Sequence, residues 1–373
     1  MTGPFTAPAY QDRSLGDVLP AVAKALGVDV DFHDTSLAFP AGRSYVVFLI
    51  DGLGYELLRD HAGEAPFLHS LLEGQAPATV GVPSTTATSL TSLGTALAPG
   101  HHGVVGYTTR IPGTQRLLNA LMWDKRVDPR DWQPHRTAFD RLASAGVRTT
   151  VVNKRNFAGS GLTVAGQRGA EFIGADRHGE RLAAVLAASR MSPSLTYMYD
   201  GDLDWTGHKY GAASAQWVAQ LSVIDVAVEH LRGTLPRDTR LVVVADHGMV
   251  DSPLEDRVDV DDRPQLREGV AVLGGEARFR HLYCREGAAD DVLAAWRGEL
   301  DGRALVLSRE DALARGWFGP VTSDVRPRLG DVMVACDGTF AVQSTSAFPH
   351  EAKLVGLHGS LTSAEMLIPV LVT

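Results

Sequence analysis

Residues 46–58 read VVFLIDGLGYELL, and this stretch predicts both a fold class and a site. Its first five residues, Val46 to Ile50, are continuously apolar, which is typical of a parallel strand buried on both faces. Asp51 ends this run and is followed by a turn over residues 52–54. Open α/β sheets bind ligands at the carboxyl ends of their strands, although a carboxylate there can also simply cap the next helix.

A second stretch of the same design favours the ligand-binding interpretation. Residues 242–249 read VVVADHGM, so another apolar run ends in Asp246 and His247. Between and around the two stretches, apolar periodicity alternates between strand and helix. We expect strands at 45–50, 149–152, 195–199, 241–245 and 368–372, and helices at 15–26 (weakened by Pro20), 55–61, 65–73, 87–93, 137–145, 178–189 and 214–232. This order predicts an α/β fold with a mostly parallel central sheet and helices on both faces.

The composition changes after residue 250. Residues 251–268 hold seven acidic side chains and three arginines, which indicates a surface loop or a boundary. Residues 270–345 then carry short elements of their own, with strands expected at 279–284, 305–307 and 332–336 and helices at 288–300 and 309–315. We therefore expect four segments: a lead-in that packs on the core (1–43), a first core part (44–250), an inserted α+β cap (251–345) and a final core part (346–373).

Composition excludes several classes of protein. The net charge of -9 over 373 residues argues against binding of a nucleic-acid polymer, which normally needs a basic face. The sequence shows neither a signal-peptide pattern at its start nor an apolar run of ~20 residues, so we expect a cytoplasmic protein with no membrane partner. Two cysteines, Cys284 and Cys336, make no disulfide framework, but a single bridge stays open, as does the oligomeric state.

The expected strand 195–199 runs into an acidic segment, DGDLDWTGH (200–208). Its D-x-D-x-D start resembles a calcium loop, but Trp205 stands where the tight turn needs glycine and Gly211 stands where a bidentate Glu belongs. Asp204 and His208 are four residues apart, so one helical turn places them on the same face. That pairing suits a metal site with carboxylate and imidazole ligands, whereas a solvated acidic loop is the simpler alternative.

A Ser/Thr-rich segment, GVPSTTATSL (81–90), precedes another expected helix. Hydroxyls before a helix usually act only as N-caps. A helix N-terminus also binds anions, because its free N–H groups and dipole favour negative charge. Near an acidic metal cluster, a hydroxyl held there could act as a nucleophile. The neighbouring histidines His101 and His102 lie in an expected turn and are poorly spaced to bind one metal.

Collected together, the candidate residues form one constellation at expected strand ends. Three carboxylates and three imidazoles are too many for one tetrahedral zinc, and they suit two metals ~4 Å apart. Mixed nitrogen and oxygen ligands favour zinc, with manganese or iron as alternatives. The constellation comprises Asp51, Thr86, Asp204, His208, Asp246, His247 and His358.

These motifs resemble the alkaline phosphatase superfamily, and within it the type I phosphodiesterase/nucleotide pyrophosphatase family. The resemblance rests on IDGLG, PSTT, APGHHGVVG, D-x-x-x-H at 204–208, ADHGM and the HG at 358–359. It implies a three-layer αβα sandwich with Thr86, the fourth residue of the Pro-Ser-x-Thr segment, as nucleophile. It further implies two divalent metals, one held by Asp51, Thr86, Asp246 and His247 and the other by Asp204, His208 and His358.

The sequence departs from the family pattern around the substrate. Ala87-Thr88-Ser89-Leu90 replaces an aromatic residue followed by Pro-Asn-His, and Gly106-Tyr107 replaces a pair of asparagines. Candidate substrate contacts are therefore Ala87, Tyr107, Lys154 and Trp205. Tyr107, Trp205 and Phe157 could form an apolar wall for a leaving group, and Lys154, Arg155, Arg110 and Lys125 could hold a dianionic phosphoryl end.

Together these features predict a binuclear-metal-dependent hydrolase that acts on a small-molecule phosphoester. The expected reaction is cleavage of phosphate diesters or nucleotide pyrophosphate bonds through a covalent phospho-threonine. The same residues would also serve a phosphomonoesterase, a phosphonate hydrolase or a phosphomutase. A non-catalytic, anion-binding relative is the least favoured alternative, because no expected ligand is missing. Sulfatases fit less well, because no C-x-P-x-R or S-x-P-x-R segment is present.

Overall fold

The computed structural model describes residues 5–373, and its centre is a six-stranded sheet of order β18-β8-β1-β7-β5-β6. Five strands run parallel, and β18 at the edge pairs antiparallel with β8. All seven residues of β1 are buried, as its continuous apolar run predicts. The expected mostly parallel sheet is therefore confirmed. The strands are β1 (Ser44–Ile50), β5 (Arg148–Asn153), β6 (Glu171–Gly174), β7 (Ser194–Asp200), β8 (Thr239–Val244) and β18 (Val370–Val372).

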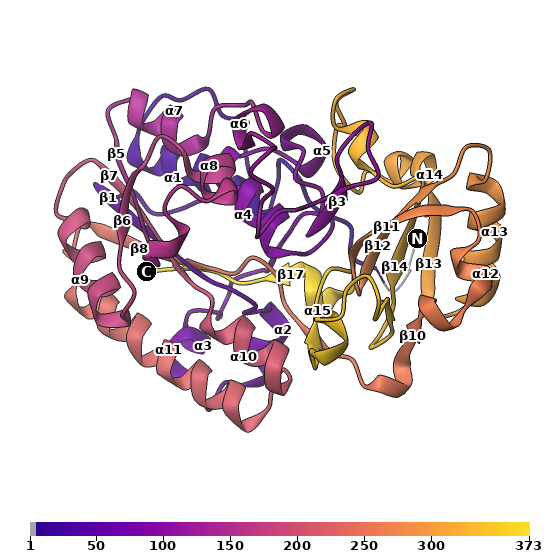
Figure 1. Cartoon of the computed structure of the whole chain (residues 1–373). Helices are drawn as coiled ribbons and strands as arrows, with labels where there is room; N and C mark the ends of the chain where they lie inside the picture. The colour runs from indigo at the N-terminus through magenta and orange to yellow at the C-terminus, as the bar shows by residue number, and fades with distance from the viewer. Residues whose placement is uncertain (1–4) are drawn as a thin grey trace.

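Helices cover both faces of this sheet, which gives the expected three layers (Figure 1). One layer holds α1 (Val18–Leu26), α4 (Thr86–Thr95), α7 (Ala138–Ser144) and α8 (Gly161–Gln167). The opposite layer holds α9 (His178–Ser189), α11 (Ala215–Thr234) and α3 (Pro66–Ser70). Pro20 does not interrupt α1, because it lies in the first turn, where a missing N–H breaks no helical hydrogen bond. None of the described helices is both long and apolar enough to cross a bilayer.

A second sheet lies beside the first, on the right of Figure 1. Its order is β11-β12-β14-β13 and every pairing is antiparallel. Trp296 of α13 (Ala289–Glu299) is buried against it in a separate apolar cluster. Both cysteines are free, so the open question of a bridge is answered. The strands are β11 (Val270–Glu276), β12 (Phe279–Cys284), β13 (Ala304–Ser308) and β14 (Val332–Cys336). The cap boundaries at 251 and 345 stay a prediction, which this separate sheet and cluster support.

Several elements differ from the sequence-based expectation. The expected strand 368–372 is divided at Pro369, which has no N–H to donate: β17 (Leu367–Ile368) pairs with β2 (Ala78–Thr79), and only β18 joins the central sheet. The expected helix 65–73 is reduced to α3. The helix α8, the strands β6 and β11, and the hairpin of β3 (Thr108–Arg110) with β4 (Leu117–Asn119) were not expected. These elements are short and carry little apolar periodicity.

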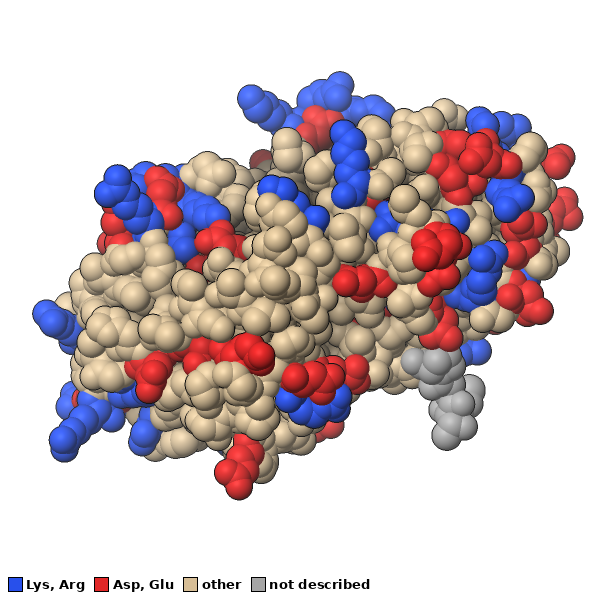
Figure 2. Space-filling model, turned by 90° about the horizontal axis from the view of Figure 1, so that it is seen from below, with Lys and Arg blue, Asp and Glu red and all other residues tan. Residues whose placement is uncertain are grey.

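The remaining elements connect these layers. They are α2 (Tyr55–Asp60), α5 (Pro99–His102), α6 (Pro129–Trp132), α10 (Asp202–Tyr210), α12 (Pro264–Arg267), α14 (Arg309–Ala314) and α15 (Ser363–Met366), with β9 (Val250–Asp251) paired to β16 (Gly356–Leu357) and β10 (Arg257–Asp259) paired to β15 (Ala341–Gln343). On the face shown in Figure 2, acidic side chains interrupt the uncharged middle, and no continuous basic surface is visible there.

Buried ion pairs tie the second sheet to the chain that re-enters the core. Arg278, the residue before β12, donates to Glu365 at 2.7 and 3.1 Å, and both side chains are fully buried. Glu365 in turn accepts from the Ser360 amide at 3.0 Å, two residues after His358. A second buried pair joins Arg280 to Glu351. Removing one partner of such a pair would leave an uncompensated buried charge, which is strongly destabilising. Because Glu351 precedes His358 and Glu365 follows it, the two pairs fix the chain on both sides of this histidine.

The contact between α4 and α8 gives a test of the packing. A Cβ on Gly94 would lie 1.8 Å from the Gly166 carbonyl oxygen, so the two helices meet at a glycine. We expect Gly94→Ala to lower the free energy of unfolding by about 1–3 kcal/mol, because backbone must move to relieve the clash. Urea denaturation measures this.

Gly233→Ala is the matched control. Gly233 also lies in a helix, α11, but a Cβ there meets nothing within 4 Å, so we expect a gain of up to ~1 kcal/mol from helix propensity. Equal stability changes in the two variants would contradict the packing argument.

Candidate active site

The register of three parallel strands places the acidic residues together. Ile50 pairs with Asp200, and Leu49 pairs with Val244, so β1, β7 and β8 end at the same edge of the sheet. Asp51 follows β1 directly, and Asp246 follows β8 after one residue. The Gly52 amide donates to Asp246 Oδ1 at 3.1 Å, which links the two strand ends.

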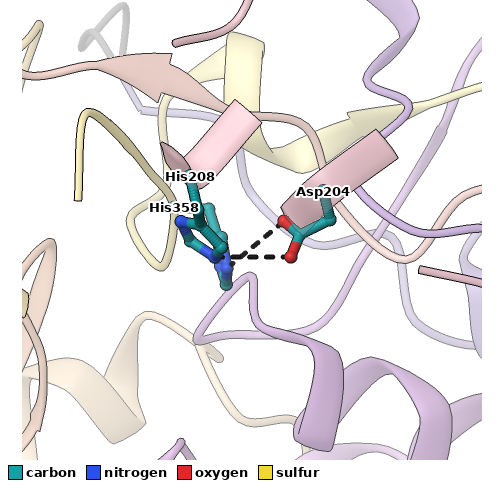
Figure 3. Close-up of side chains that lie close together, drawn as sticks. All are labelled: Asp204, His208 and His358. Carbon is teal, nitrogen blue, oxygen red and sulfur yellow. Dashed lines mark ion pairs between the residues drawn. The ribbon is translucent and has the colours of Figure 1, made fainter. Parts of the chain in front are cut away.

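Asp204 and His208 lie on α10, which begins just after β7, so the expected helical spacing is present. His208 Nε2 lies 3.4 Å from Asp204 Oδ2, and His358 Nε2 lies 3.9 Å from Asp204 Oδ1 (Figure 3). Gly52 has φ +75°, and a Cβ there would meet Asp204 Cβ at 3.0 Å. The glycine therefore allows α10 to approach the end of β1 closely.

All three histidines present the same ring nitrogen to the cluster. Nδ1 of His208 donates to the Gly356 carbonyl at 2.7 Å, Nδ1 of His247 to the Gly248 carbonyl at 2.9 Å, and Nδ1 of His358 to the Ser84 carbonyl at 3.0 Å. A carbonyl only accepts, so Nδ1 carries the proton and Nε2 of each neutral ring keeps its lone pair. Burial lowers the pKa of His247 and His358, which favours this neutral form.

The ligand-type atoms gather in two groups that share Asp204. One group is Asp204, His208 and His358, and the other is Asp51, Asp204 and His247; within each group the ligand atoms lie within 4.8 Å of one another. Asp246 Oδ2 lies 3.6 Å from His247 Nε2, beside the second group. Figure 3 shows Asp204 facing the imidazoles of the first group.

The carboxylates fit bound cations. Asp51 Oδ1, Asp204 Oδ1 and Asp246 Oδ2 are buried without a hydrogen-bond partner among the described residues. Burial, together with the charges of Asp246 and Asp204, raises the pKa of Asp51 well above its usual range, and burial also raises the pKa of Asp204 and Asp246. Buried like charges at this spacing are stable only when they are protonated or neutralised by positive charge. Carboxylate oxygens and imidazole Nε2 atoms form a donor set that suits a divalent metal.

Thr86 lies beside both groups. It is the first residue of α4, one position earlier than the expected helix start, and its hydroxyl lies 3.2 Å from His247 Nε2 and 3.5 Å from Asp51 Oδ2. The Ser89 hydroxyl donates to the Asp246 carbonyl at 2.6 Å, which fixes α4 against the end of β8. The first N–H groups of a helix have no intrahelical partner, so those after Thr86 are available to an anion.

A cavity of about 660 Å³ opens onto this cluster. Thr86, Asp204, His208 and His358 line it, together with two of the expected substrate contacts, Tyr107 and Trp205. The other lining residues are Thr85, Asn119, Leu121, Lys209, Glu276, Ala277, Ala347, Phe348, Pro349, His350, Glu351, Lys353, Leu354 and Leu357.

The structure places the other expected substrate contacts elsewhere. Ala87 is buried in an apolar cluster with Trp123 and Trp132 and is absent from the cavity wall, because its side chain points into the packing around α4. Lys154 is also absent from the wall, since its ammonium pairs with Asp202 at 3.0 Å. Phe157 packs edge-on against Tyr199.

The expected anion-binding cations are also outside the cavity. Arg155 pairs with Asp176 and Glu180, Arg110 packs over the Tyr283 ring, and Lys125 is exposed. His102 contacts Ser92 and the Val104 amide, and its burial lowers its pKa to about 3, so it is a neutral structural residue.

Sequence reasoning missed two residues at the site. The Tyr199 hydroxyl donates to Asp51 Oδ2 from the neighbouring strand; a polar ring one residue before the end of a buried strand was an available signal. Glu276 lies at the end of β11, where burial raises its pKa to about 8, and its Oε2 lies 3.8 Å from His358 Nδ1. No local pattern marks Glu276, because only the docking of the second sheet brings it here.

Comparisons with known proteins agree with this arrangement. Residues 45–361 match the family described as type I phosphodiesterase/nucleotide pyrophosphatase. No curated protein matches the chain. Among solved structures, murine ectonucleotide pyrophosphatase/phosphodiesterase 5 is similar, with a TM-score of 0.69 and 17% identity, over 88% of this chain and 87% of that chain.

Two further structures carry ligands. An inactive variant of the same murine protein, in which alanine replaces a threonine, was solved with AMP; it has a TM-score of 0.68 and 18% identity over 89% of this chain and 87% of that chain. Phosphonoacetate hydrolase from Sinorhizobium meliloti 1021, in complex with phosphonoformate, has a TM-score of 0.68 and 20% identity over 92% of each chain.

At these identities the structural matches establish the fold, and the family match covers most of the chain. The family resemblance inferred from the motifs is confirmed. The chain therefore belongs to the type I phosphodiesterase/nucleotide pyrophosphatase family of the alkaline phosphatase superfamily, a metal-dependent family of phosphoric ester hydrolases.

Proposed function

We propose that this hydrolase cleaves phosphodiesters at two divalent metals and uses Thr86 as its nucleophile. The observation that carries the proposal is the position of the Thr86 hydroxyl, 3.2 Å from His247 Nε2 and 3.5 Å from Asp51 Oδ2, at the start of α4 and beside both ligand groups. The inactive threonine-to-alanine variant of the murine relative supports the same role.

The donor set supports the metal assignment. Asp51, Asp246 and His247, with the Thr86 hydroxyl, would hold one cation, and Asp204, His208 and His358 would hold the other. Zinc is our first choice because nitrogen and oxygen ligands are mixed, with manganese or iron as alternatives. Bound there, the cations would lower the pKa of a coordinated hydroxyl and neutralise charge on the phosphoryl group.

The chain's own residues define the remaining steps. Thr86 Oγ attacks phosphorus and loses its proton, the bond to the leaving oxygen breaks, that oxygen takes up a proton from solvent, and a phospho-threonine results. The N–H groups of the first turn of α4 are placed to bind a non-bridging oxygen as charge develops on it. Water then attacks the same phosphorus from the side that the leaving group vacated, which releases the product and restores the Thr86 hydroxyl.

The charges around the cavity favour a diester over a monoester. A dianionic phosphoryl end calls for an additional buried cation, and Lys154, Arg155, Arg110 and Lys125 all lie outside the cavity wall. Its two lysines, Lys209 and Lys353, are exposed at the wall, and the nearest buried titratable group from the second sheet is an acid, Glu276. Glu276 thus supplies no positive charge there that would balance a second negative charge on the substrate.

Phosphonate hydrolysis is the second candidate, since phosphonoacetate hydrolase shares the fold over 92% of this chain. One experiment separates the candidates. Zinc-loaded protein is given bis-(p-nitrophenyl) phosphate, p-nitrophenyl phosphate and phosphonoacetate, before and after chelation and zinc return. We expect chelator-sensitive preference for the diester. Preference for the monoester or the phosphonate would reject the diester assignment, and metal binding without any turnover would favour an anion-binding relative.

Removing the proposed nucleophile gives the first prediction at this site. Thr86→Ala should lower the rate of diester hydrolysis by more than the ~10²–10³-fold typical for loss of one transition-state hydrogen bond. Stopped assays with radiolabelled substrate should also show phosphoryl label on wild-type protein but not on this variant.

Thr88→Val is the control for that measurement. Thr88 lies half a turn further along α4, and its buried hydroxyl has no hydrogen-bond partner within residues 5–373, so an isosteric apolar side chain should leave turnover near the wild-type rate. Near-normal hydrolysis by Thr86→Ala would remove Thr86 from the nucleophile role.

The shared position of Asp204 gives the second prediction. Asp204 would hold one cation with His208 and His358, and its carboxylate also lies within 4.8 Å of the ligand atoms of Asp51 and His247. Asp204→Asn should therefore release the first cation and weaken binding of the second, and the metal content should fall from about two per chain to about one or fewer. Elemental analysis after dialysis measures this. Asp202→Asn is the matched control on the same helix, since Asp202 is half-exposed and pairs only with basic side chains. Unchanged metal content in Asp204→Asn would contradict the assignment.

A further inference from the structure

The cavity beside the metal site has a wall that is largely apolar. Trp205 comes from α10, Leu121 from the segment after β4, and most of the other apolar side chains from residues 347–357, with Tyr107 and Ala277 beside them. That last segment leads directly to His358 and supplies Ala347, Phe348, Pro349, Leu354 and Leu357. Three segments that are distant in the sequence therefore converge on one apolar surface next to the expected ligands.

This apolar wall begins at the metal site itself. Trp205 follows Asp204, and Lys209 follows His208, so one turn of α10 presents two expected ligands and two wall residues. The Val355 amide donates to the His208 carbonyl at 2.7 Å, which joins the segment 347–357 to α10. A group attached to a phosphorus at the metals would therefore lie along this wall.

The wall continues outward onto the protein surface. Trp205 is 59% exposed and Leu121 is 47% exposed, and Met122, the next residue, is 81% exposed. The Lys209 ammonium packs over both the Trp205 ring and the exposed Tyr210 ring, at 4.8 and 4.7 Å. Large apolar side chains that are exposed together on a protein surface mark a place that a ligand covers.

Two polar side chains of the wall are already engaged within the protein. Asn119 is the amide side chain of the wall, and its Oδ1 already accepts from the Leu121 and Met122 amides at 3.0 Å each. Glu351 lines the cavity too, but it pairs with the buried Arg280. A base needs hydrogen-bond partners along its edges, whereas an aliphatic chain needs only continuous apolar contact and can extend onto the exposed rim.

We propose that this cleft binds an aliphatic chain, so that the substrate is a phosphodiester with a long alkyl group on the phosphorus. The inference rests on the proposed phosphodiesterase function and names the substrate class of that same site. The alkyl group stays on the phosphoryl unit while the other ester oxygen leaves. Its chain contacts Trp205, Phe348 and Leu354, and longer chains reach the half-exposed Leu121.

A series of alkyl p-nitrophenyl phosphates from methyl to hexyl tests this on the zinc-loaded full chain. The leaving group is constant, so a change in kcat/KM reports contact with the alkyl group. A fully buried methylene is worth about fourfold, and half-burial in an open cleft about twofold, so we expect hexyl to exceed methyl by about 30-fold. These short diesters also avoid micelles.

Variants locate the effect in the cleft. Trp205→Ala and Leu354→Ala should each lower the hexyl-to-methyl ratio of kcat/KM several-fold, because each removes part of the wall. Val226→Ala is the control: Val226 is 64% exposed on α11 and is absent from the cavity wall, so its ratio should equal that of the wild type.

Three results would overturn the inference. If the methyl ester is hydrolysed but kcat/KM does not rise with the length of the alkyl group, the aliphatic chain is rejected. The proposed phosphodiesterase function is then unaffected. A kcat/KM for thymidine 5′-p-nitrophenyl phosphate above that of the hexyl ester assigns the cleft to a nucleoside. No turnover of any diester with metal bound overturns the proposed function, and this inference with it.

Discussion

Three buried carboxylates within one small volume are the constraint on which the rest of this structure depends. Asp51 and Asp246 lie in the interior and Asp204 is 14% exposed at the cavity, and each has a buried oxygen without a hydrogen-bond partner among the described residues. Burial and the mutual repulsion of these groups raise the pKa of Asp51. An arrangement of this kind costs stability unless positive charge is bound between the carboxylates. The fold therefore maintains a costly cluster, which is typical of sites selected for chemistry rather than for stability.

The surrounding protein makes the cluster possible by fixing every group around it. The hydrogen-bonded register of β1, β7 and β8 fixes the positions of Asp51 and Asp246 at the edge of the sheet. Backbone carbonyls hold the protons of all three imidazoles on Nδ1, so each neutral ring presents a free Nε2 to the cluster, as a metal ligand would. Secondary contacts of this kind orient metal ligands and exclude alternative tautomers. The positions of Thr86 and α4 follow from the same framework, because Ser89 binds the end of β8.

The second sheet completes the site from outside the central one. The buried pair of Arg278 and Glu365 holds the chain near His358, and Glu276 approaches the same imidazole from β11. The segment before His358 also supplies one wall of the cavity. The second sheet and the segment after it thus contribute both to the candidate metal site and to the cavity beside it. Variation in such a segment can change the substrate without disturbing the carboxylates, because the latter are held by the central sheet.

The sequence by itself determined the fold class and the ligand-type residues of this protein. A parallel strand that is buried on both faces must be continuously apolar, so the strands before Asp51 and Asp246-His247 can be recognised from a few consecutive residues. The spacing of Asp204 and His208 similarly indicated a shared helical face, and α10 has it. Only the tertiary structure decided that Asp204 is shared by two groups, that Lys154 is occupied by Asp202, and that Tyr199 and Glu276 join the site. These facts depend on strand register and on the docking of two sheets, and side-chain distances across such contacts are not encoded in any local sequence pattern.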